Sequence, residues 1–190
     1  MNSIPANTTQ TLSSVDASGR GSTSELKRAD ATAVAQNGLS TPGASLPGTA
    51  TTGRRLQDCT DVGLQFTQWL LSNPYAWANA SLGLNSQIPG NATVSVLELS
   101  RCGVLVDFGS PVEVKVAMPE REAEVDETPT CTIFDAGGAV FVARRMVLGL
   151  GQWVRDNITL TSASRETMIA TCETSSSGAY AIYYRPRTKE

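Results

Sequence analysis

Apolar side chains recur at every second position over much of the chain after residue 91. Between Cys102 and Phe108 the residues Cys102, Val104, Val106 and Phe108 alternate with Gly103, Leu105 and Asp107. Between Val112 and Met118 the apolar residues alternate with Glu113, Lys115 and Ala117. A period of two places one set of side chains on one face of an extended strand and the other set on the opposite face. A Gly-Ser-Pro turn separates the two runs, so we expect an antiparallel pair of strands with one buried face.

Five further segments of strand-like sequence follow the second run. They are CTIFD, AVFVARRMVL, WVRDNITL, TMIATC and AYAIYY, which begin at residues 131, 139, 153, 167 and 179. The acidic stretch PEREAEVDETP, which precedes them, is expected to form an exposed loop. Short strands separated by turns bury their apolar faces most economically as two packed sheets, so the sequence predicts a mostly β fold and a β-sandwich.

The first 57 residues have a different composition. Thirty-four of residues 1–55 are Ser, Thr, Gly, Ala or Pro, and the first aromatic side chain of the chain is Phe66. A segment without large apolar side chains cannot offset the entropy cost of ordering by burial. We therefore expect residues 1–57 to be a largely irregular, Ser/Thr-rich stalk or linker, and residues 58–190 to be the globular domain.

The globular part is expected to begin with one or two short helices. In DVGLQFTQWLLS, the residues Val62, Phe66, Trp69 and Leu70 fall on one stripe of a helix. This helix is expected to end before Pro74, because a residue that precedes proline is pushed out of the helical region. The following YAWANASLG is read as a second short helix or as a loop.

Cysteine usage indicates a disulfide-bonded domain. The four cysteines, Cys59, Cys102, Cys131 and Cys172, are widely spaced, form no C-x-x-C pair and occur in a chain without histidine. A zinc site is therefore disfavoured, and two disulfides are favoured over buried free thiols. Of the three possible connectivities we expect the sequential one, Cys59–Cys102 with Cys131–Cys172. Each bridge would close a loop of about 40 residues and contribute about 4 kcal/mol in the chain-entropy model.

Glycosylation motifs favour an extracellular or cell-surface location. Four of the eight asparagines begin an Asn-x-Ser/Thr acceptor tripeptide: Asn7, Asn79, Asn91 and Asn157. The N-terminal MNSIPANTTQ has neither the basic nor the apolar region of a signal peptide, so we expect the chain to be cut from a larger precursor. Its longest apolar run is too short to cross a bilayer.

The absence of histidine removes most catalytic chemistry. The chain cannot build a Ser-His-Asp site, a Cys-His site or a histidine metal site. Ser-Lys chemistry needs a buried lysine, whereas Lys115 lies on the polar face of a predicted strand and Lys189 lies at the C-terminal end. The acidic stretch lacks the glycine turn and the ordered ligand spacing of a calcium loop. We therefore expect no enzyme, no cofactor and no metal, and the formal net charge of −3 gives no electrostatic reason to expect nucleic acid.

Two aromatic residues are candidates for a ligand or partner surface. Tyr75 and Trp77 follow the predicted helix and precede the Asn79 acceptor site. Exposed rings in such a place can stack on a sugar or contact a protein. Trp69, in contrast, falls on the apolar stripe and is expected in the core.

The last 60 residues resemble a known motif. Cys131 is followed by an aromatic-Asp pair, Phe134-Asp135, then by Trp153, and then by Cys172 with a strand of small and aromatic residues. This order resembles the GPS motif, which is the C-terminal part of the GAIN domain of adhesion receptors and polycystin-type proteins. The resemblance implies a GAIN-like β-sandwich in a membrane-proximal setting.

The resemblance also marks a position for a nucleophile. Laid on the pattern, Cys172 takes the place of the final cysteine, Thr174 that of the histidine and Ser176 that of the self-cleaving residue. Two of the motif's four cysteines are missing and the histidine is replaced, so Ser176 has no base to take its proton. The resemblance therefore implies the fold and not autoproteolysis.

Together these inferences predict a non-catalytic extracellular glycoprotein module with a structural or adhesive role in a larger cell-surface or extracellular assembly. Its expected partners are other extracellular or membrane proteins, copies of itself among them, with N-linked glycans and O-linked glycans on the N-terminal segment. The alternative is a ligand-binding receptor ectodomain that recognises a carbohydrate or a protein through Tyr75 and Trp77. A self-processing domain acting at Ser176 is a third, disfavoured reading.

Overall fold

The computed structural model describes residues 8–48, 60–76, 79–80, 88–120, 124, 127–135, 140–142, 145–147 and 151–186. Within these residues the elements, in chain order, are β1 (Thr8–Val15), β2 (Gly21–Asp30), α1 (Ala31–Asn37), β3 (Leu39–Thr41), β4 (Ala44–Leu46), β5 (Asp61–Leu70), β6 (Asn79–Ala80), β7 (Val94–Arg101), β8 (Val104–Val106), β9 (Val112–Ala117), β10 (Glu127–Asp135), β11 (Val140–Val142), β12 (Arg145–Val147), β13 (Gln152–Val154), β14 (Ile158–Ser164), β15 (Ile169–Thr174) and β16 (Gly178–Pro186).

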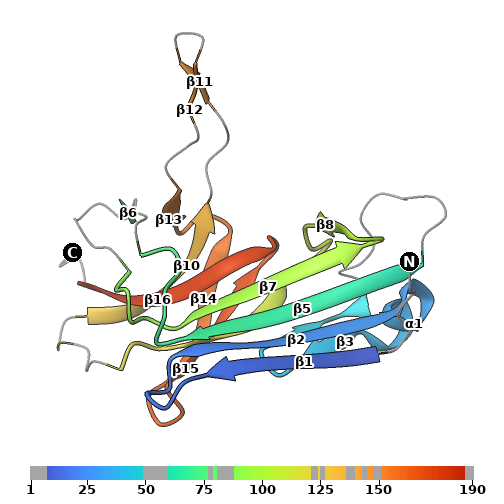
Figure 1. Cartoon of the computed structure of the whole chain (residues 1–190), viewed down its shortest axis with the longest axis horizontal. Coiled ribbons are helices and arrows are strands. Elements are labelled where there is room, and N and C mark those ends of the chain that lie inside the picture. The colour runs from blue at the N-terminus through green and yellow to red at the C-terminus, as the bar shows by residue number, and fades with distance from the viewer. Residues whose placement is uncertain are drawn as a thin grey trace.

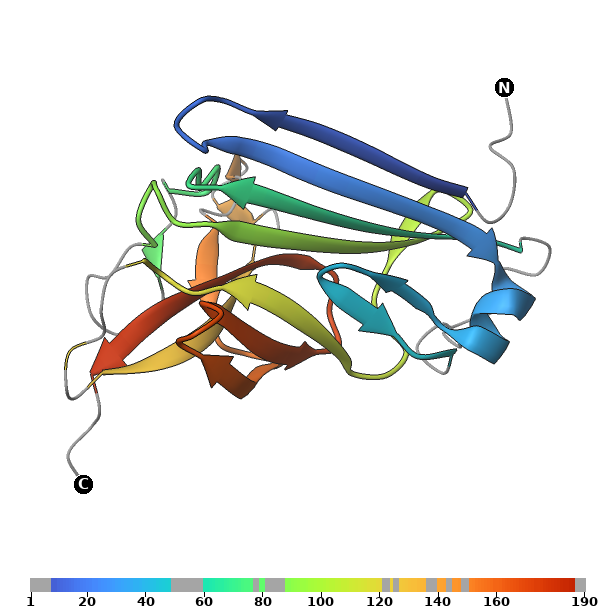
Figure 2. The ribbon, with the colours of Figure 1, turned by 90° about the horizontal axis from the view of Figure 1, so that it is seen from below.

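The strands form two sheets that pack face to face, which confirms the mostly β prediction and a sandwich-like arrangement. The long sheet has the strand order β1-β2-β5-β7-β16-β10-β13-β6, with β8 attached to β7. The second sheet has the order β14-β15-β9-β4-β3, and it lies under the central and C-terminal strands of the long sheet (Figure 2). The β11–β12 hairpin is a separate two-stranded unit that projects away from the sandwich (Figure 1).

Most of the core lies between the two sheets. Strand β5 buries Val62, Leu64 and Phe66 on its inner face. The second sheet contributes Val112, Val114 and Val116 of β9 to the same core. On β9 these valines alternate with the exposed Glu113 and Lys115, as the period of two predicts. Full burial of such a side chain stabilises the fold by roughly 1.5–3 kcal/mol.

The prediction of an irregular N-terminal segment is wrong for residues 8–48. Strand β2 pairs with β5 over ten residues, β1 pairs with β2 over eight, and β4 pairs with β9 of the second sheet. Small side chains from this segment also enter the core: Ala29, Val34, Ala44 and Leu46. The main-chain hydrogen bonds to β5 order a segment that has too few large side chains to order itself.

The predicted helix over DVGLQFTQWLLS is a strand, β5. Val62, Leu64 and Phe66 are buried in alternation, and the strand pairs on both sides, with β2 and with β7. The helical stripe omitted Leu64, which is fully buried. In the described residues the helix is α1. Its N-cap is Asp30, whose carboxylate accepts a hydrogen bond of 2.8 Å from the Thr32 amide, and its C-cap is Gly38, which has a φ of 68°.

The predicted hairpin across the Gly-Ser-Pro turn is also wrong. Its first half, β8, folds back on β7 through a turn at Cys102 and Gly103, both of which have positive φ. Its second half, β9, lies in the second sheet between β15 and β4. The two runs have the expected extended conformation, but the turn between them carries the chain from one sheet to the other.

Candidate functional site

The disulfide Cys131–Cys172 joins the two sheets. Cys131 lies on β10 of the long sheet and Cys172 on β15 of the second sheet, with 6.1 Å between their Cα atoms, and both side chains are buried. This predicted bridge is therefore confirmed. Cys102 is also disulfide-bonded, whereas Cys59 lies outside the described residues, so the Cys59–Cys102 pairing stays a prediction.

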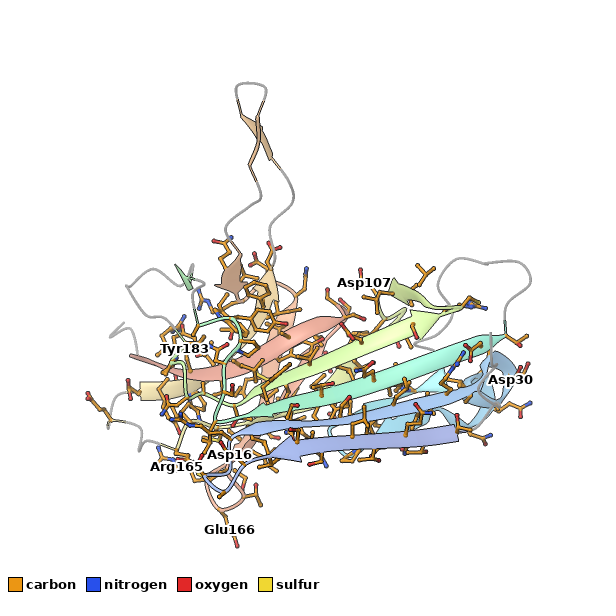
Figure 3. The ribbon with its side chains drawn as sticks, viewed as in Figure 1. Asp16, Asp30, Asp107, Arg165, Glu166 and Tyr183 are labelled. Carbon is orange, nitrogen blue, oxygen red and sulfur yellow. A yellow bond between two sulfur atoms is a disulfide. The ribbon has the colours of Figure 1, made fainter. Side chains whose placement is uncertain are left out.

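The turn between β15 and β16 contains the residues that occupy the nucleophile region of the GPS pattern. The Ser177 hydroxyl donates to the Val106 carbonyl at 2.7 Å and accepts from the Leu99 amide at 3.3 Å. The Ser177 amide donates to the Asp107 carboxylate at 3.2 Å. These bonds attach the turn to β7, to β8 and to the segment that follows β8, which lies at one end of the long sheet (Figure 3).

Main-chain groups of Ser175 and Ser176 in this turn are also held by hydrogen bonds. The Ser176 amide donates to the buried Thr174 hydroxyl at 3.2 Å, and the Ser175 carbonyl accepts from the Phe108 amide at 3.1 Å. The Tyr180 hydroxyl donates to the Ser176 carbonyl. Burial raises the pKa of Tyr180 well above its ordinary value, so this phenol stays a neutral donor. The turn is thus built as a structural element from its own main chain and hydroxyls.

A shallow trough runs across the outer face of β1, β2, β5 and β7, opposite the core; we call it the outer trough. The register aligns alternate residues of the four strands on this face, as in the row Leu12, Ser24, Thr67 and Val96. The trough has a volume of about 560 Å³ and is lined by Leu12, Ser13, Ser14, Ser22, Ser24, Gln65, Thr67, Trp69, Tyr75, Val96 and Glu98.

Polar side chains form the floor of the outer trough. The hydroxyls of Ser24 and Thr67 are 2.9 Å apart, and the Gln65 amide nitrogen donates to Ser24 at 3.2 Å. Glu98 lies directly opposite Gln65 on the neighbouring strand. The pKa of Tyr75 is raised, first by burial and then by the negative charge of Glu98, so the phenol at the wall of the trough remains neutral.

An aromatic cluster closes one end of the outer trough. The ring centroids of Tyr75 and Phe134 are 4.3 Å apart, and Trp153, which is fully buried, meets both rings edge-on at 5.9 and 5.6 Å. Trp69 is half-buried and packs against this cluster, so the prediction that places it in the core holds only in part. Tyr75 is both a cluster member and a trough wall, whereas Trp77 lies outside the described residues.

Two of the acceptor asparagines lie in exposed turns of the described residues. Asn91 and Asn157 are exposed, and Asn157 has a φ of 59° in the turn before β14. The backbone of Asn79 belongs to β6, and Asn7 lies outside the described residues. The sequon hydroxyl of Thr93 accepts a hydrogen bond of 3.2 Å from the Leu71 amide.

A second hollow, of about 360 Å³, opens beside Asn91. Its wall includes Tyr183, which is at the opposite end of the molecule from Asp30 (Figure 3). Burial raises the pKa of Tyr183, and the positive charges of Arg155 and Arg185 act in the opposite direction. Its phenol hydroxyl is buried without a hydrogen-bond partner among the described residues, so the hollow holds an unsatisfied polar group.

In the part of the chain that the structure describes, no three His, Cys, Asp or Glu side chains gather as metal ligands would. Of the glutamates in the acidic stretch, Glu120, Glu124 and Glu127 are described, and the Glu127 carboxylate accepts from the Glu124 amide at 2.9 Å. Among the described residues, no helix has the length and apolarity needed to span a membrane.

Sequence reasoning missed the outer trough because residues 8–30 were read as irregular. The signal in TTQTLSSV and GSTSELK is weak, because both stretches are polar or small at nearly every position apart from Leu12, Val15 and Leu26. Comparison with protein-family models, with curated proteins and with solved structures gave no match.

Proposed function

We propose that the chain is a non-catalytic extracellular glycoprotein module with a structural or adhesive role in a larger cell-surface or extracellular assembly. The observation that carries this proposal is the outer trough, a hollowed and polar sheet face with two aromatic walls. Trp69 and Tyr75 supply apolar contact area there, and Gln65 and Glu98 supply hydrogen bonds. This combination is typical of surfaces that hold another molecule.

The turn at residues 174–177 supports the non-catalytic part of the proposal. The amides of Ser176 and Ser177, the carbonyls of Ser175 and Ser176, and the hydroxyls of Thr174 and Ser177 are engaged in hydrogen bonds that fix the path of the chain. The Asp107 carboxylate, which is hydrogen-bonded to this turn, accepts from the Ser177 amide and from no serine hydroxyl in the bonds described. We propose that the chain is related to GAIN domains in its fold and not in their self-cleavage. In this fold the Cys131–Cys172 disulfide ties the last strands together. An intact mass of the full chain after secretion tests it, and cleavage before Ser176 would contradict it.

The extracellular part of the proposal is supported by the disulfides and by the exposed asparagines. Expression in a secretory host, followed by mass spectrometry of tryptic peptides, should find N-glycans on Asn91 and Asn157. The variant Asn91→Gln is the matched control, because it removes the acceptor and keeps Thr93, whose hydroxyl the Leu71 amide uses. Unmodified asparagines at both positions would remove the main argument for the compartment.

The ligand-binding alternative uses the same trough. Aromatic walls beside an amide and a carboxylate suit a carbohydrate, whose rings stack on aromatic side chains and whose hydroxyls pair with polar groups. Binding of the full chain to a glycan array tests this alternative. Gln65→Ala should weaken any array signal about tenfold or more, the equivalent of about 1.4 kcal/mol.

The control for this experiment is Glu113→Ala, which changes an exposed side chain on the second sheet and should leave the array signal unchanged. An array signal that Gln65→Ala and Glu113→Ala reduce equally would place the sugar elsewhere. If the labelled protein gave no signal on the array but bound to cells of the organism it comes from, a protein partner for the outer trough would be favoured.

A further inference from the structure

Strand β1 is an open edge of the long sheet. It pairs with β2 over eight residues in an unbroken register, and among the described residues no strand pairs with its other side. Natural proteins protect such edges with charges, prolines or bulges. The sequence of β1, TTQTLSSV, has no charged residue and no proline, and its register has no bulge. An unprotected edge of this length is suited to pairing with another strand.

The edge is also uncovered on its two faces. The second sheet does not reach under β1, which lies along the rim of the molecule (Figure 2). Every residue of β1 after Thr8 is exposed, and Leu12 is 75% exposed, the highest value among the large apolar residues described. Val15 is 43% exposed. The strand therefore presents apolar area and main-chain groups in the same place.

The turn after β1 fixes which main-chain groups are available. The Asp16 amide donates to the Arg20 carbonyl at 2.8 Å, and the Asp16 carboxylate accepts from the amides of Ser18 and Arg20 (Figure 3 labels Asp16). Asp16 and Arg20 are therefore a hydrogen-bonded pair, and the register of β1 and β2 continues from them without a break. Even-numbered residues of β1 thus direct their N–H and C=O groups at β2. Odd-numbered residues direct theirs outward.

We propose that β1 pairs with β1 of a second copy of the chain, antiparallel, about a two-fold axis at Leu12. An axis perpendicular to the sheet keeps the outer face of each copy on the same side, so even-numbered residues must lie opposite even-numbered ones. In the register centred on Leu12, the two Leu12 side chains meet on the outer face at a non-hydrogen-bonded position, where side chains approach most closely.

The same register uses the outward main-chain groups. Thr11 then lies opposite Ser13 and Thr9 opposite Val15; each pairing occurs twice by symmetry and exchanges two N–H···O bonds. No charge faces another charge across this edge, because β1 carries none. A second copy therefore supplies an edge that matches β1 in length, main-chain pattern and lack of charge. The two outer troughs then open on the same side of one continuous sheet.

The first test is a charge exchange at the axis, with association measured by analytical ultracentrifugation of the full chain. The unaltered protein should show a concentration-dependent dimer. Leu12→Lys and Leu12→Glu should each abolish it, because two like charges would face each other, and mixing the two variants should restore a dimer. Leu105→Lys, which alters a 60% exposed leucine on β8, is the matched control and should dimerise like the unaltered chain.

The second test fixes the register by cross-linking. Under mild oxidation, Leu12→Cys should give a covalent dimer rapidly. Gln10→Cys alone should not, because Gln10 lies opposite Ser14 in this register, but a mixture of Gln10→Cys with Ser14→Cys should cross-link. A monomeric unaltered protein at its highest soluble concentration would overturn the proposal. A Gln10→Cys dimer that forms as fast as the Leu12→Cys dimer would overturn the register. Neither outcome bears on ligand binding by the outer trough, which the glycan array reports.

Discussion

Gly43 lies directly against the ring of Phe66. A Cβ placed on Gly43 would come within 1.9 Å of Phe66 Cζ, so the loop between β3 and β4 touches the centre of the core only because this residue has no side chain. The Gly43 carbonyl also accepts a hydrogen bond of 2.7 Å from the Lys115 amide of β9. The contact joins the N-terminal segment to both sheets.

Gly43→Ala should therefore destabilise the protein by about 1–3 kcal/mol, the usual cost of overpacking a core. The loss should be smaller in a Phe66→Leu background, where the ring is absent. Chemical denaturation of the unaltered chain, of Gly43→Ala, of Phe66→Leu and of the double variant measures the coupling free energy between the two positions. Gly90→Ala is the control, because its Cβ would meet its nearest atom at an ordinary 3.7 Å. Equal losses for Gly43→Ala in both backgrounds would contradict the contact.

Removal of residues 1–57 should unfold the remaining domain. The deletion takes away β1 to β4 and α1, uncovers an edge of β5, and removes Ala29, Val34, Ala44 and Leu46 from the core. Fragment 58–190 should lack a cooperative thermal transition and near-ultraviolet circular dichroism. Adding the separately produced 1–57 segment should restore both. A fragment 58–190 that unfolds like the full chain would restore the stalk interpretation.

Ser177→Ala should cost about 1–3 kcal/mol, because it leaves the Val106 carbonyl and the Leu99 amide without the hydroxyl that both use. Ser176→Ala is the matched substitution, since the bonds described for Ser176 use its main-chain amide and carbonyl. It should change the free energy of unfolding by less than about 0.5 kcal/mol. Urea denaturation compares the loss of unfolding free energy in the two variants. A larger loss for Ser176→Ala than for Ser177→Ala would show that the Ser177 hydroxyl does not hold the turn.

Tyr180 predicts a loss of stability at alkaline pH. Its folded-state pKa is raised above the ordinary value of 10.0, chiefly by burial. Stability from this group is complete below pH 10.0, and it falls as the pH rises from there toward the folded pKa, because the unfolded chain releases the proton first. The slope for one such group is about 1.4 kcal/mol per pH unit.

Tyr180→Phe should flatten that alkaline slope and should also cost about 1 kcal/mol at neutral pH, through the lost hydrogen bond to the Ser176 carbonyl. Denaturation curves collected on both sides of pH 10.0 separate the two effects. Tyr75 and Tyr183 also have raised pKa values, so some alkaline dependence should persist in the variant. An unchanged slope would show that the Tyr180 phenol ionises in the folded state.

The Cys131–Cys172 bridge should account for a large part of the stability. Replacing both cysteines by alanine opens a loop of sequence separation 41, and the chain-entropy model gives a loss of about 4 kcal/mol. Differential scanning calorimetry of the double variant under non-reducing conditions measures the loss. An unchanged transition would mean that packing between β10 and β15 holds the two sheets without the bridge.

The C-terminal half of the fold was predictable because its strands bury one face. In β9 and β16 the apolar residues that the core needs are visible as alternation or as a run of aromatic and small residues, and the Cys131–Cys172 bridge is part of the sequential pairing that was expected among three possible ones. The period in β5 was ambiguous, since Val62, Phe66 and Trp69 also fit a helix. Pairing with strands on both sides decided for the extended form.

The sequence by itself determined the mostly β character and the lack of histidine chemistry, because these depend on residue type and short-range period, whereas the structure selected Cys131–Cys172 from the possible pairings. Only the tertiary structure decided that residues 8–30 are two long strands and that β8 and β9 belong to different sheets. The physical reason is that main-chain hydrogen bonds between distant segments carry little trace in the side chains. Strand β1 takes its order from β2, and β2 from β5, so their structure is fixed by neighbours and not by their own composition.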